Sequence, residues 1–469
     1  MIKPAARAAR ARARAQDGTQ GQARRWLVFA VLGAVAFMAQ LDLFVVNVAL
    51  PEMGGVFHTP LSDLSWVLNA YSIALAALLV PAGRMADQFG RRRFLLVGVG
   101  VFTAASIICA ASPTLLLLVV GRMLQGAGAA MIVPTSLGLL FPAFPRQEHN
   151  LVVGLWAGVA AIAAASGPTL GGLLVSVDWR WIFLINVPIG IATVLGGLRV
   201  VPEVRAAEGE RMPSVTSVLS LMTCVGLFTF GLVQTTQWGW ASPPTLVVFA
   251  GAVLAGALAV RQALSQSHAV IEAALFRASG EFTAASVSLF LFFVAFAAWL
   301  LINVLFFQNE WHLNPLQTGI AIVPGPASAA VFALNAGRIT RRFGRRAPAI
   351  TGALCYVAGA LFWLLTTTAE PNYIMFVPGL IVAGSGAGLI QAPLFASAST
   401  LPANRATTGS AVLNMARQVG SAVGVALLIT ILAGDPTDSI VGYHRGFAFM
   451  AAAGVAAAIA IALPRRTAS

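Results

Sequence analysis

Residues 83–92 read GRMADQFGRR and residues 337–346 read GRITRRFGRR, so a short basic segment occurs twice in this chain. The two copies agree at six of ten positions and begin 254 residues apart (337 − 83). Each copy follows one long apolar run and precedes another. A basic segment repeated between apolar runs predicts two related bundles of membrane helices, because internal repeats of this kind build many membrane proteins.

The composition predicts a membrane protein. Of the residues, 58% are hydrophobic and 10% are charged, whereas a soluble domain carries about 25% charged residues. Segments this apolar are stable in a bilayer rather than in water. The net charge of +13 therefore indicates contact with the lipid surface and not binding of nucleic acid.

The residue types exclude several function classes. Lys3 is the only lysine, so neither a phosphate-binding loop with its lysine nor a Schiff base is available. The three cysteines lie in apolar runs and the five histidines are scattered, so no metal site is predicted. No loop gathers His, Asp and Glu as an enzyme site would, and we expect neither a cofactor nor an enzymatic reaction.

Fourteen apolar runs are long enough to cross a bilayer, which takes about 20 residues per helix. They do not alternate polar and apolar residues as barrel strands do, so we predict an all-α integral membrane protein. The predicted spans are 26–49, 61–82, 94–111, 115–140, 151–176, 181–199, 215–235, 244–262, 282–307, 316–336, 347–367, 372–396, 408–433 and 446–463.

Arginine placement predicts the orientation. With the N-terminus inside the cell, 25 of the 29 basic residues fall in inner segments, as the positive-inside rule requires. We therefore expect a multi-pass protein of the cell membrane with both termini in the cytoplasm. The apolar run that follows the basic tail is too long for the hydrophobic part of a signal peptide. We expect the tail to be disordered and to contact anionic lipid.

The repeat also predicts the domain organisation. It pairs the segment after span 2 with the segment after span 10, eight spans later, which is six spans for a bundle and two more. We expect two six-helix bundles with pseudo-two-fold symmetry and a linker of two extra helices, in a protein that is a monomer. The ranges are a tail 1–25, a first bundle 26–200, a linker 201–280, a second bundle 281–464 and a cytoplasmic end 465–469.

Four further stretches carry patterns in particular spans. Residues 40–51 read QLDLFVVNVALP in the first span, and residues 121–130 read GRMLQGAGAA in the fourth. Residues 166–172 read SGPTLGG in the fifth span, and residues 178–188, which follow it, read DWRWIFLINVP. Together with the repeated basic segment, they resemble the 14-span drug:proton antiporter family of the major facilitator superfamily, over residues 26–464. This resemblance implies a secondary transporter that works by alternating access and uses a proton gradient.

Asp42 is the first candidate for proton coupling. It lies within the first span, where an acidic side chain costs roughly 2.5–3.5 kcal/mol on insertion scales. Burial disfavours the charged form of a carboxyl group, so Asp42 can take up and release a proton. The alternative is a structural acid that is hydrogen-bonded to Asn47 or to a backbone carbonyl.

Arg122 is the second candidate for proton coupling. It lies in the outer part of the fourth span, and the resemblance implies that it assists proton transfer. A fixed cation beside a carboxylate favours the charged carboxylate and so restores it after protonation. The alternative is an arginine that extends to the outer lipid headgroups.

The repeated basic segment is a candidate gate between the bundles. Glycines allow a tight turn there, and Asp87 can form an ion pair that breaks during the transport cycle. The alternative is a solvated inner loop. In the second copy the acid is replaced by Arg341, so the gate chemistry belongs to the first copy. Its residues are Gly83, Arg84, Asp87, Gly90 and Arg91.

The fifth span carries the pattern that the resemblance associates with antiporters. Small residues four apart allow close helix packing, and we expect proline to break or kink this span, where the halves could rock. The alternative is ordinary helix packing. The residues are Gly167, Pro168, Gly171 and Gly172.

Other polar or aromatic residues within spans are candidates for the wall of a cavity. For Arg417, an interpretation as a packing or lipid-facing residue competes with this one. Glu310 is expected in an outer loop. One secure acid within the membrane favours hydrophobic, neutral or monocationic substrates over dications. The candidate cavity residues are Asn47, Gln125, Trp299, Asn303, Asn414 and Arg417.

The predicted function is export of hydrophobic or monocationic drug-like compounds in exchange for protons. The first alternative is a transporter of the same fold for a metabolite such as a sugar, a siderophore or a biosynthetic product. A membrane receptor that does not transport is the second. The sequence names neither the compound nor the number of protons exchanged.

Overall fold

The computed structural model describes residues 3–145, 148–204, 214–265, 273–401, 406–433 and 439–463, and the description of side chains omits those of residues 3–22, of Arg84 and of Asp87, among others. The described residues form helices joined by turns, with no strand among them. The helices are α1 (Lys3–Phe57), α2 (Leu61–Leu64), α3 (Trp66–Phe89), α4 (Arg91–Ala111), α5 (Leu115–Ala143), α6 (His149–Val175), α7 (Trp181–Leu184), α8 (Asn186–Val200), α9 (Val215–Trp238), α10 (Pro243–Ser265), α11 (Ala273–Ala278), α12 (Gly280–Leu305), α13 (Pro315–Ile322), α14 (Pro324–Phe343), α15 (Arg346–Thr366), α16 (Tyr373–Phe395), α17 (Ala406–Leu432) and α18 (Ser439–Ala462), with a π-helical turn at Phe306–Glu310 and a 3-10 turn at Ala396–Thr400.

Thirteen helical segments of the described chain are long and apolar enough to cross a membrane. They coincide with thirteen of the fourteen expected spans. The other expected span, 151–176, coincides with α6, in which the apolar segment is Ile162–Val175. The protein is therefore a multi-pass all-α membrane protein, and the count of fourteen stays a prediction.

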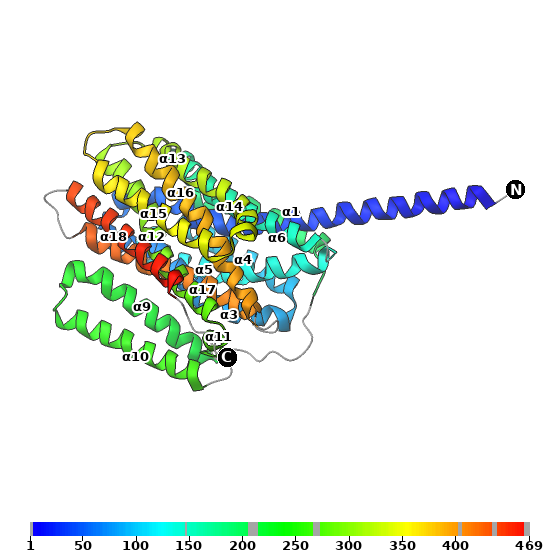
Figure 1. Ribbon diagram of the computed structural model, residues 1–469, viewed down its shortest axis with the longest axis horizontal. Helices are drawn as coiled ribbons and strands as arrows, with labels where there is room; N and C mark the ends of the chain where they lie inside the picture. The colour runs from blue at the N-terminus through cyan, green and yellow to red at the C-terminus, as the bar shows by residue number, and fades with distance from the viewer. Residues whose placement is uncertain are drawn as a thin grey trace.

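The N-terminal tail differs from its expected form. α1 begins at Lys3 and continues through the tail and the first span to Phe57, and it projects from the body of the molecule in Figure 1. The expectation of a disordered tail was wrong. Alanine and arginine are among the strongest helix formers, and a helix that is already nucleated in the membrane extends readily into such a segment.

Three expected spans consist of two helices each. Hydropathy does not detect these breaks, because both parts of each span are apolar. At the third break, Pro324 begins the new helix, as proline does at a first helical position. The divided spans are 61–82 (α2 and α3), 181–199 (α7 and α8) and 316–336 (α13 and α14).

α6, in contrast, is continuous. It contains Pro168 and still runs from His149 to Val175, so the expected break in this span was wrong. Proline is tolerated within membrane helices because neighbouring helices and local adjustments satisfy the freed backbone groups. Close neighbours are present here, since α6 packs along α1 and against α13 and α14.

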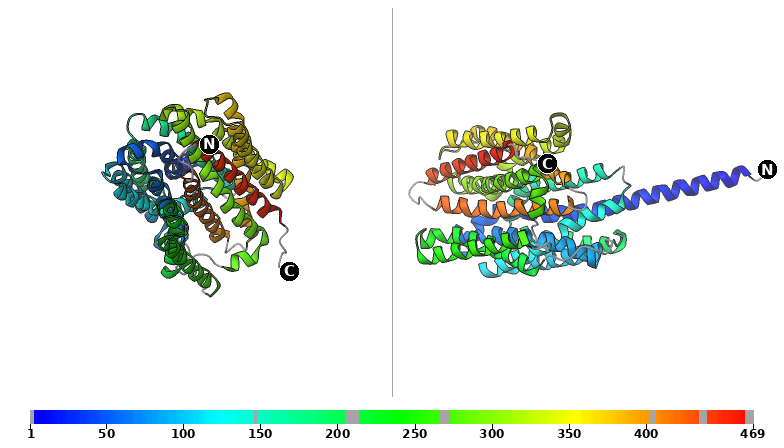
Figure 2. Two further views of the ribbon diagram at one scale, coloured as in Figure 1. Left: turned by 90° about the vertical axis from the view of Figure 1, so that its left-hand side faces the viewer. Right: turned by 60° about the horizontal axis from the view of Figure 1, so that its bottom comes forward.

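The helices pack in two groups. In the first group α5 packs against α3 and α4, and α1 packs against α6 and α8. In the second, α12 packs against α17 and α18, and α16 packs against α14 and α15. The groups meet where α3 lies along α17 and where α6 lies along α13 and α14. Figure 2 shows these helices running roughly along one common direction.

α9 and α10 form a pair at one edge of the molecule (Figures 1 and 2). Val225 of α9 packs with Ile73 of α3 and Ala422 of α17. The Thr430 hydroxyl of α17 donates a hydrogen bond to the Leu232 carbonyl oxygen of α9 at 2.9 Å. α9 therefore covers the line along which α3 and α17 meet, while α10 leaves an apolar face exposed to lipid.

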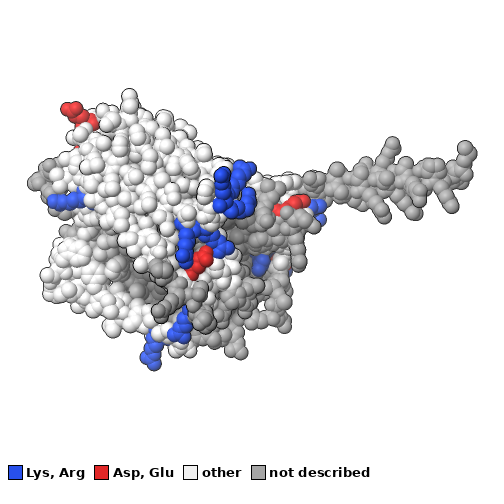
Figure 3. Space-filling view, viewed as in Figure 1, with Lys and Arg blue, Asp and Glu red and all other residues white. Residues whose placement is uncertain are grey.

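The surface has the charge distribution of a membrane protein. Figure 3 shows a face that is almost free of charged side chains over much of its area. Most of the basic side chains drawn there lie toward the end from which α1 projects. Exposed apolar residues are common on the surface of the described chain, as contact with lipid requires.

Candidate functional site

The centre of the first group of helices holds a buried ion pair. Asp42 of α1 and Arg122 of α5 have exposed side-chain fractions of 0% and 1%. Arg122 Nη1 donates to Asp42 Oδ2. The other carboxylate oxygen accepts from Gln125 Nε2 at 3.3 Å and from Asn186 Nδ2 at 3.1 Å. Three donors from two further helices therefore surround one carboxylate.

Arg122 is fixed by more than its carboxylate. Its Nε donates to the Val67 carbonyl oxygen at 2.8 Å, and its Nη1 also donates to Gln125 Oε1 at 2.8 Å. The guanidinium carbon lies 4.4 Å from the centre of the Tyr71 ring, a cation–π geometry. An unpaired charge here would be costly, because an isolated buried ion loses its hydration without replacement.

A second layer of polar groups orients the first. The Ser106 hydroxyl of α4 accepts from Gln125 Nε2 at 2.8 Å and from Asn186 Nδ2 at 3.3 Å. Ser106 itself donates to the Phe102 carbonyl oxygen at 2.9 Å. The network thus joins α1, α4, α5 and α8.

Glycines in α5 bring the helices of this network together. A Cβ atom on Gly126 would lie 2.5 Å from the Tyr71 carbonyl oxygen of α3. A Cβ atom on Gly128 would lie 2.8 Å from the Phe102 backbone nitrogen of α4. Only glycine permits these approaches, which place Arg122 over Tyr71.

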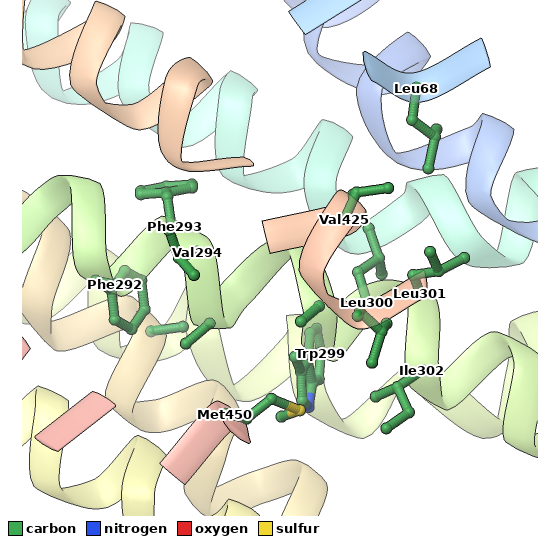
Figure 4. Close-up of a cluster of buried hydrophobic side chains, with 14 of the residues drawn as sticks. Leu68, Phe292, Phe293, Val294, Trp299, Leu300, Leu301, Ile302, Val425 and Met450 are labelled. Carbon is green, nitrogen blue, oxygen red and sulfur yellow. The ribbon is translucent and has the colours of Figure 1, made fainter. Parts of the chain in front are cut away.

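A cavity of about 70 Å³ lies between the two groups of helices, which is room for a few water molecules. Arg122 forms part of its wall, and Asp42 lies behind Arg122. Figure 4 shows four apolar members of the wall, Leu68, Phe293, Leu300 and Val425. The complete wall comprises Gln40, Leu43, Phe44 and Asn47 of α1, Leu68 and Ser72 of α3, Arg122 of α5, Phe293, Phe296, Ala297 and Leu300 of α12, and Arg417, Gln418, Ser421 and Val425 of α17.

The two groups are in contact beside this cavity, toward the C-terminal end of α1. Gln308 Nε2 donates to the Val48 carbonyl oxygen at 3.3 Å, and the Thr169 hydroxyl donates to the Gly319 carbonyl oxygen at 3.3 Å. A Cβ atom on Gly172 would lie 2.3 Å from the Pro315 carbonyl oxygen. The glycine pattern of the fifth span therefore serves contact between the groups.

The same pattern also packs against α1 next to Asp42. A Cβ atom on Gly167 would lie 2.5 Å from Phe44 Cβ, and one on Gly171 would lie 2.9 Å from the Val45 carbonyl oxygen. α6 thus touches α1 one turn beyond Asp42 and touches α13 of the other group. Because α6 contacts both α1 and α13, a movement of α6 would change contacts in both groups of helices.

The candidate gate segment is attached to the end of α8. Gly90 has φ of 102°, and the Arg91 backbone nitrogen donates to the Val204 carbonyl oxygen at 2.9 Å. Arg92 N donates to Glu203 Oε1 at 3.1 Å, and Arg91 Nη1 donates to the Gly138 carbonyl oxygen at 2.8 Å. These bonds join the start of α4 to α5 and to the segment that follows α8.

Part of the gate lies outside the described residues. The side chains of Arg84 and Asp87 are not described, so the expected ion pair of Asp87 stays a prediction. Gly83 packs near Pro134 of α5, at a distance that would allow a Cβ atom.

Most of this chain matches the model of one known protein family. The family model described as Major Facilitator Superfamily matches residues 32–425 and, in a second match, residues 289–468. The chain belongs to the major facilitator superfamily. The members of this family are membrane transporters and not enzymes.

Several characterised members are similar over most of the chain. The multidrug resistance protein Stp of Mycobacterium tuberculosis is 34% identical over 87% of this chain and 76% of its own length. The tetracenomycin C resistance and export protein of Streptomyces glaucescens is 32% identical over 88% and 77%. A methylenomycin A resistance protein of Streptomyces coelicolor is 35% identical over 84% and 83%.

Solved structures share the fold. The nucleoside transporter NupG aligns with a TM-score of 0.64 at 12% identity, over 93% of this chain and 98% of the other. A bacterial homologue of the human lysosomal transporter Spinster aligns with a TM-score of 0.64 at 15% identity, over 94% and 96%. At these identities the likeness concerns the fold alone.

Of the six residues expected to line a cavity, three lie in its wall or directly behind it, and three lie elsewhere. Asn47 and Arg417 line the cavity, and Gln125 lies behind Arg122 in the polar network. The other three lie outside the cavity wall: Trp299 stacks on Phe296 at 5.6 Å between ring centres, Asn303 donates to the Trp299 carbonyl oxygen, and Asn414 donates to the Ser410 carbonyl oxygen.

Some members of the site were not predicted. Asn186 stood within a quoted stretch but was given no role, and Ser106 and Tyr71 carried no pattern at all. Asn47, considered as a partner for Asp42, instead donates to its own helix at the Leu43 carbonyl oxygen. Glu310, expected in an outer loop, instead ends the π-helical turn after α12 and is the last residue of the span Gly280–Glu310.

Proposed function

We propose that this transporter exports hydrophobic drug-like compounds in exchange for protons, by alternating access to the cavity between its two groups of helices. The observation that carries the proposal is the Asp42–Arg122 pair, buried directly behind the cavity wall. The names of the similar resistance and efflux proteins support the class of substrate.

The proton would act through the ion pair. A proton that enters from outside binds an oxygen of Asp42 and neutralises the carboxylate, so the attraction to Arg122 is lost. Arg122 then retains Val67 and Gln125 as partners, and its guanidinium is free to move toward the cavity. When the proton leaves toward the cytoplasm, the pair forms again. The difference in contacts between the two states is what allows a proton to shift the conformation.

The access change would use contacts already described. The bonds of Gln308 and Thr169 between the groups must break for the cavity to open on that side. The segment Gly83–Arg91 would form the opposing contacts, with Gly90, Arg91 and Glu203 as its anchor to α8.

Transport in proteoliposomes tests this proposal. Everted vesicles that carry the wild-type protein should accumulate members of a panel of hydrophobic fluorescent compounds when the lumen is made acidic. A protonophore should abolish the accumulation. Asp42→Asn, which keeps the shape of the side chain and removes its titratable group, should abolish it as well.

Asp63→Asn is the matched control, because Asp63 is a carboxylate of the same half that lies in the short helix α2 at the end of a span. This variant should accumulate the compounds as the wild type does. Equal proton-driven accumulation by Asp42→Asn and the wild type would contradict the proposal, provided that both variants elute as single species.

The finer topology belongs to the same proposal. We infer fourteen spans, with α6 as the fifth, arranged as two six-helix bundles of pseudo-two-fold symmetry and two linker helices, α9 and α10. We place both termini in the cytoplasm, because the basic residues then lie inside, and we expect a monomer to be the transporting unit.

One observation favours a second candidate function. A relative is named as a resistance and export protein for tetracenomycin C, so the compound could be a product made by the same cell. Deletion of the gene in its native host separates the candidates. Retention of a secreted product inside the cell supports this function, whereas sensitivity only to foreign compounds supports the first.

A further inference from the structure

The wall of the cavity contains two arginines with unequal surroundings. Arg122, from the first half, is paired with Asp42. Arg417, from the second half, has no ion pair or side-chain hydrogen bond to any described residue, and its Nε atom is buried without a partner. Its guanidinium lies over the Phe293 ring, whose centre is 5.7 Å away.

The charges around the cavity therefore do not cancel. Arg122 and Asp42 compensate each other, and Arg417 leaves one positive charge on the wall. Asp42 is the only carboxylate in direct contact with a wall residue among the described residues. A cation within the membrane is costly unless an anion or a polar group compensates it. The arrangement lacks an anion at Arg417.

The surroundings of Arg417 indicate what kind of anion would fit. Gln418, next to it on α17, is 3% exposed, and its Nε2 donor has no partner. The facing helix α12 presents Phe293 and Phe296 to the cavity. Phe296 is stacked between Phe292 and Trp299, with interplanar angles of 26° and 23°. One side of the cavity thus offers donors, and the other offers aromatic rings, of which Phe296 has its faces covered by its two neighbours.

We propose that the cavity, once the two groups of helices move apart, binds aromatic organic monoanions, such as aryl carboxylates, sulfonates and phenolates. Arg417 and the Gln418 amide bind the acidic group, and the rings of Phe293 and Phe296 contact the aromatic ring with their edges. This inference rests on the proposed export function and specifies its substrate class. It replaces the monocationic part of the sequence-based expectation, since a fixed positive charge in the wall repels cations.

The proposal has an electrical consequence. Exchange of one proton inward for one monoanion outward moves two positive charges inward. The same exchange moves one charge for a neutral compound and none for a monocation. Transport of the anion should therefore respond strongly to the membrane potential, even without a pH gradient.

The test uses two permanently charged probes of similar size, a naphthalene sulfonate and a naphthylmethyl trimethylammonium ion. Neither crosses the bilayer by changing its protonation. Everted proteoliposomes with the full chain should take up the sulfonate faster than the ammonium ion, under an imposed potential that is positive in the lumen. Arg417→Gln should lower sulfonate uptake by about tenfold or more, because a charge-assisted contact is lost.

Two further variants separate charge from folding. Arg417→Lys keeps the charge and should retain more sulfonate uptake than Arg417→Gln. Arg261→Gln removes an exposed arginine of α10 and should behave as the wild type. Elution of Arg417→Gln as a single species, with thermal unfolding no lower than that of the wild type, would show that the protein is folded and that the loss of uptake comes from the anion contact.

The outcomes distinguish this inference from the proposed function. Equal sulfonate uptake by Arg417→Gln and the wild type would overturn the inference alone, as would preference of the wild type for the ammonium ion. Full displacement of the sulfonate by an equal concentration of chloride would also overturn it, because the site would then bind small inorganic anions. Failure of the wild type to exchange any compound for protons would instead overturn the proposed function.

Discussion

The two halves of this transporter face the same cavity with different chemistry. The first half surrounds Asp42 and Arg122 with side-chain amide and hydroxyl groups on three helices. The second half presents α12, whose rings stack on one another, and Tyr356, whose hydroxyl donates to the Ala295 carbonyl oxygen at 2.8 Å. The buried ion pair thus lies in one half, and the stacked aromatic surface lies in the other.

The halves are alike in how their helices are held together. A Cβ atom on Gly126 would meet the Tyr71 carbonyl oxygen at 2.5 Å, and one on Gly386 would meet the Gly352 carbonyl oxygen at 2.4 Å. At the ends of the helices, Glu203 approaches Arg93 and Glu281 approaches Arg345. A common scaffold of closely packed helices thus carries two different cavity walls.

The largest predicted effect concerns the two arginines of the cavity. Arg122→Gln should destabilise the protein by about 3–5 kcal/mol, because it leaves Asp42 buried without its cation. Arg417→Gln removes a charge that has no partner and should leave stability unchanged or higher. Thermal unfolding in detergent, followed by tryptophan fluorescence, measures the difference.

The double variant Asp42→Asn with Arg122→Gln is the control for this pair. It should be more stable than Arg122→Gln alone, because no unpaired charge remains. Equal losses for Arg122→Gln and Arg417→Gln would remove the contrast between the halves.

A smaller effect is expected from the glycines that both halves share. Gly126→Ala and Gly386→Ala should each cost about 1–3 kcal/mol, since the new Cβ atom meets a backbone oxygen. Gly226→Ala has no atom within 4 Å of its new Cβ and serves as the control. If the two halves are built alike, the first two variants lose similar amounts in the same unfolding measurement, and a large loss in one half only would disprove that likeness.

The smallest effect is expected at the ends of the helices. Glu203→Gln and Glu281→Gln each remove a partly exposed ion pair and should cost less than about 1 kcal/mol. The loss should shrink in high salt, which screens such pairs. A loss as large as that of Arg122→Gln would mean that these pairs hold the fold, and unfolding at two salt concentrations decides the question.

The sequence predicted the charged centre because charge is rare in apolar runs. Asp42 and Arg122 stood out for that reason, and the structure places them in contact. Ser106 and Asn186 could not be found in this way, since single small polar residues are common in membrane helices. Their role depends on which faces of α4 and α8 turn toward α5, which only the packing determines.

The failures of prediction have similar causes. The break expected at Pro168 does not occur, because contacts with α1 and α13 support a continuous helix. The tail forms the first part of α1 because its composition favours helix once the adjoining membrane part of α1 has formed. Glu203 was not predicted as a partner of the gate segment, since it is more than 100 positions away from Arg92 and only the fold brings them together.

The central claim is that Asp42 carries the exchanged proton. Its most direct test measures protons and compound together, with a pH-sensitive dye inside proteoliposomes and a fluorescent substrate preloaded on one side. In the wild type, each movement of substrate should be accompanied by a proton movement in the opposite direction. Asp42→Asn should still exchange substrate for substrate, but with no proton signal. A proton signal of wild-type size in Asp42→Asn would contradict the account.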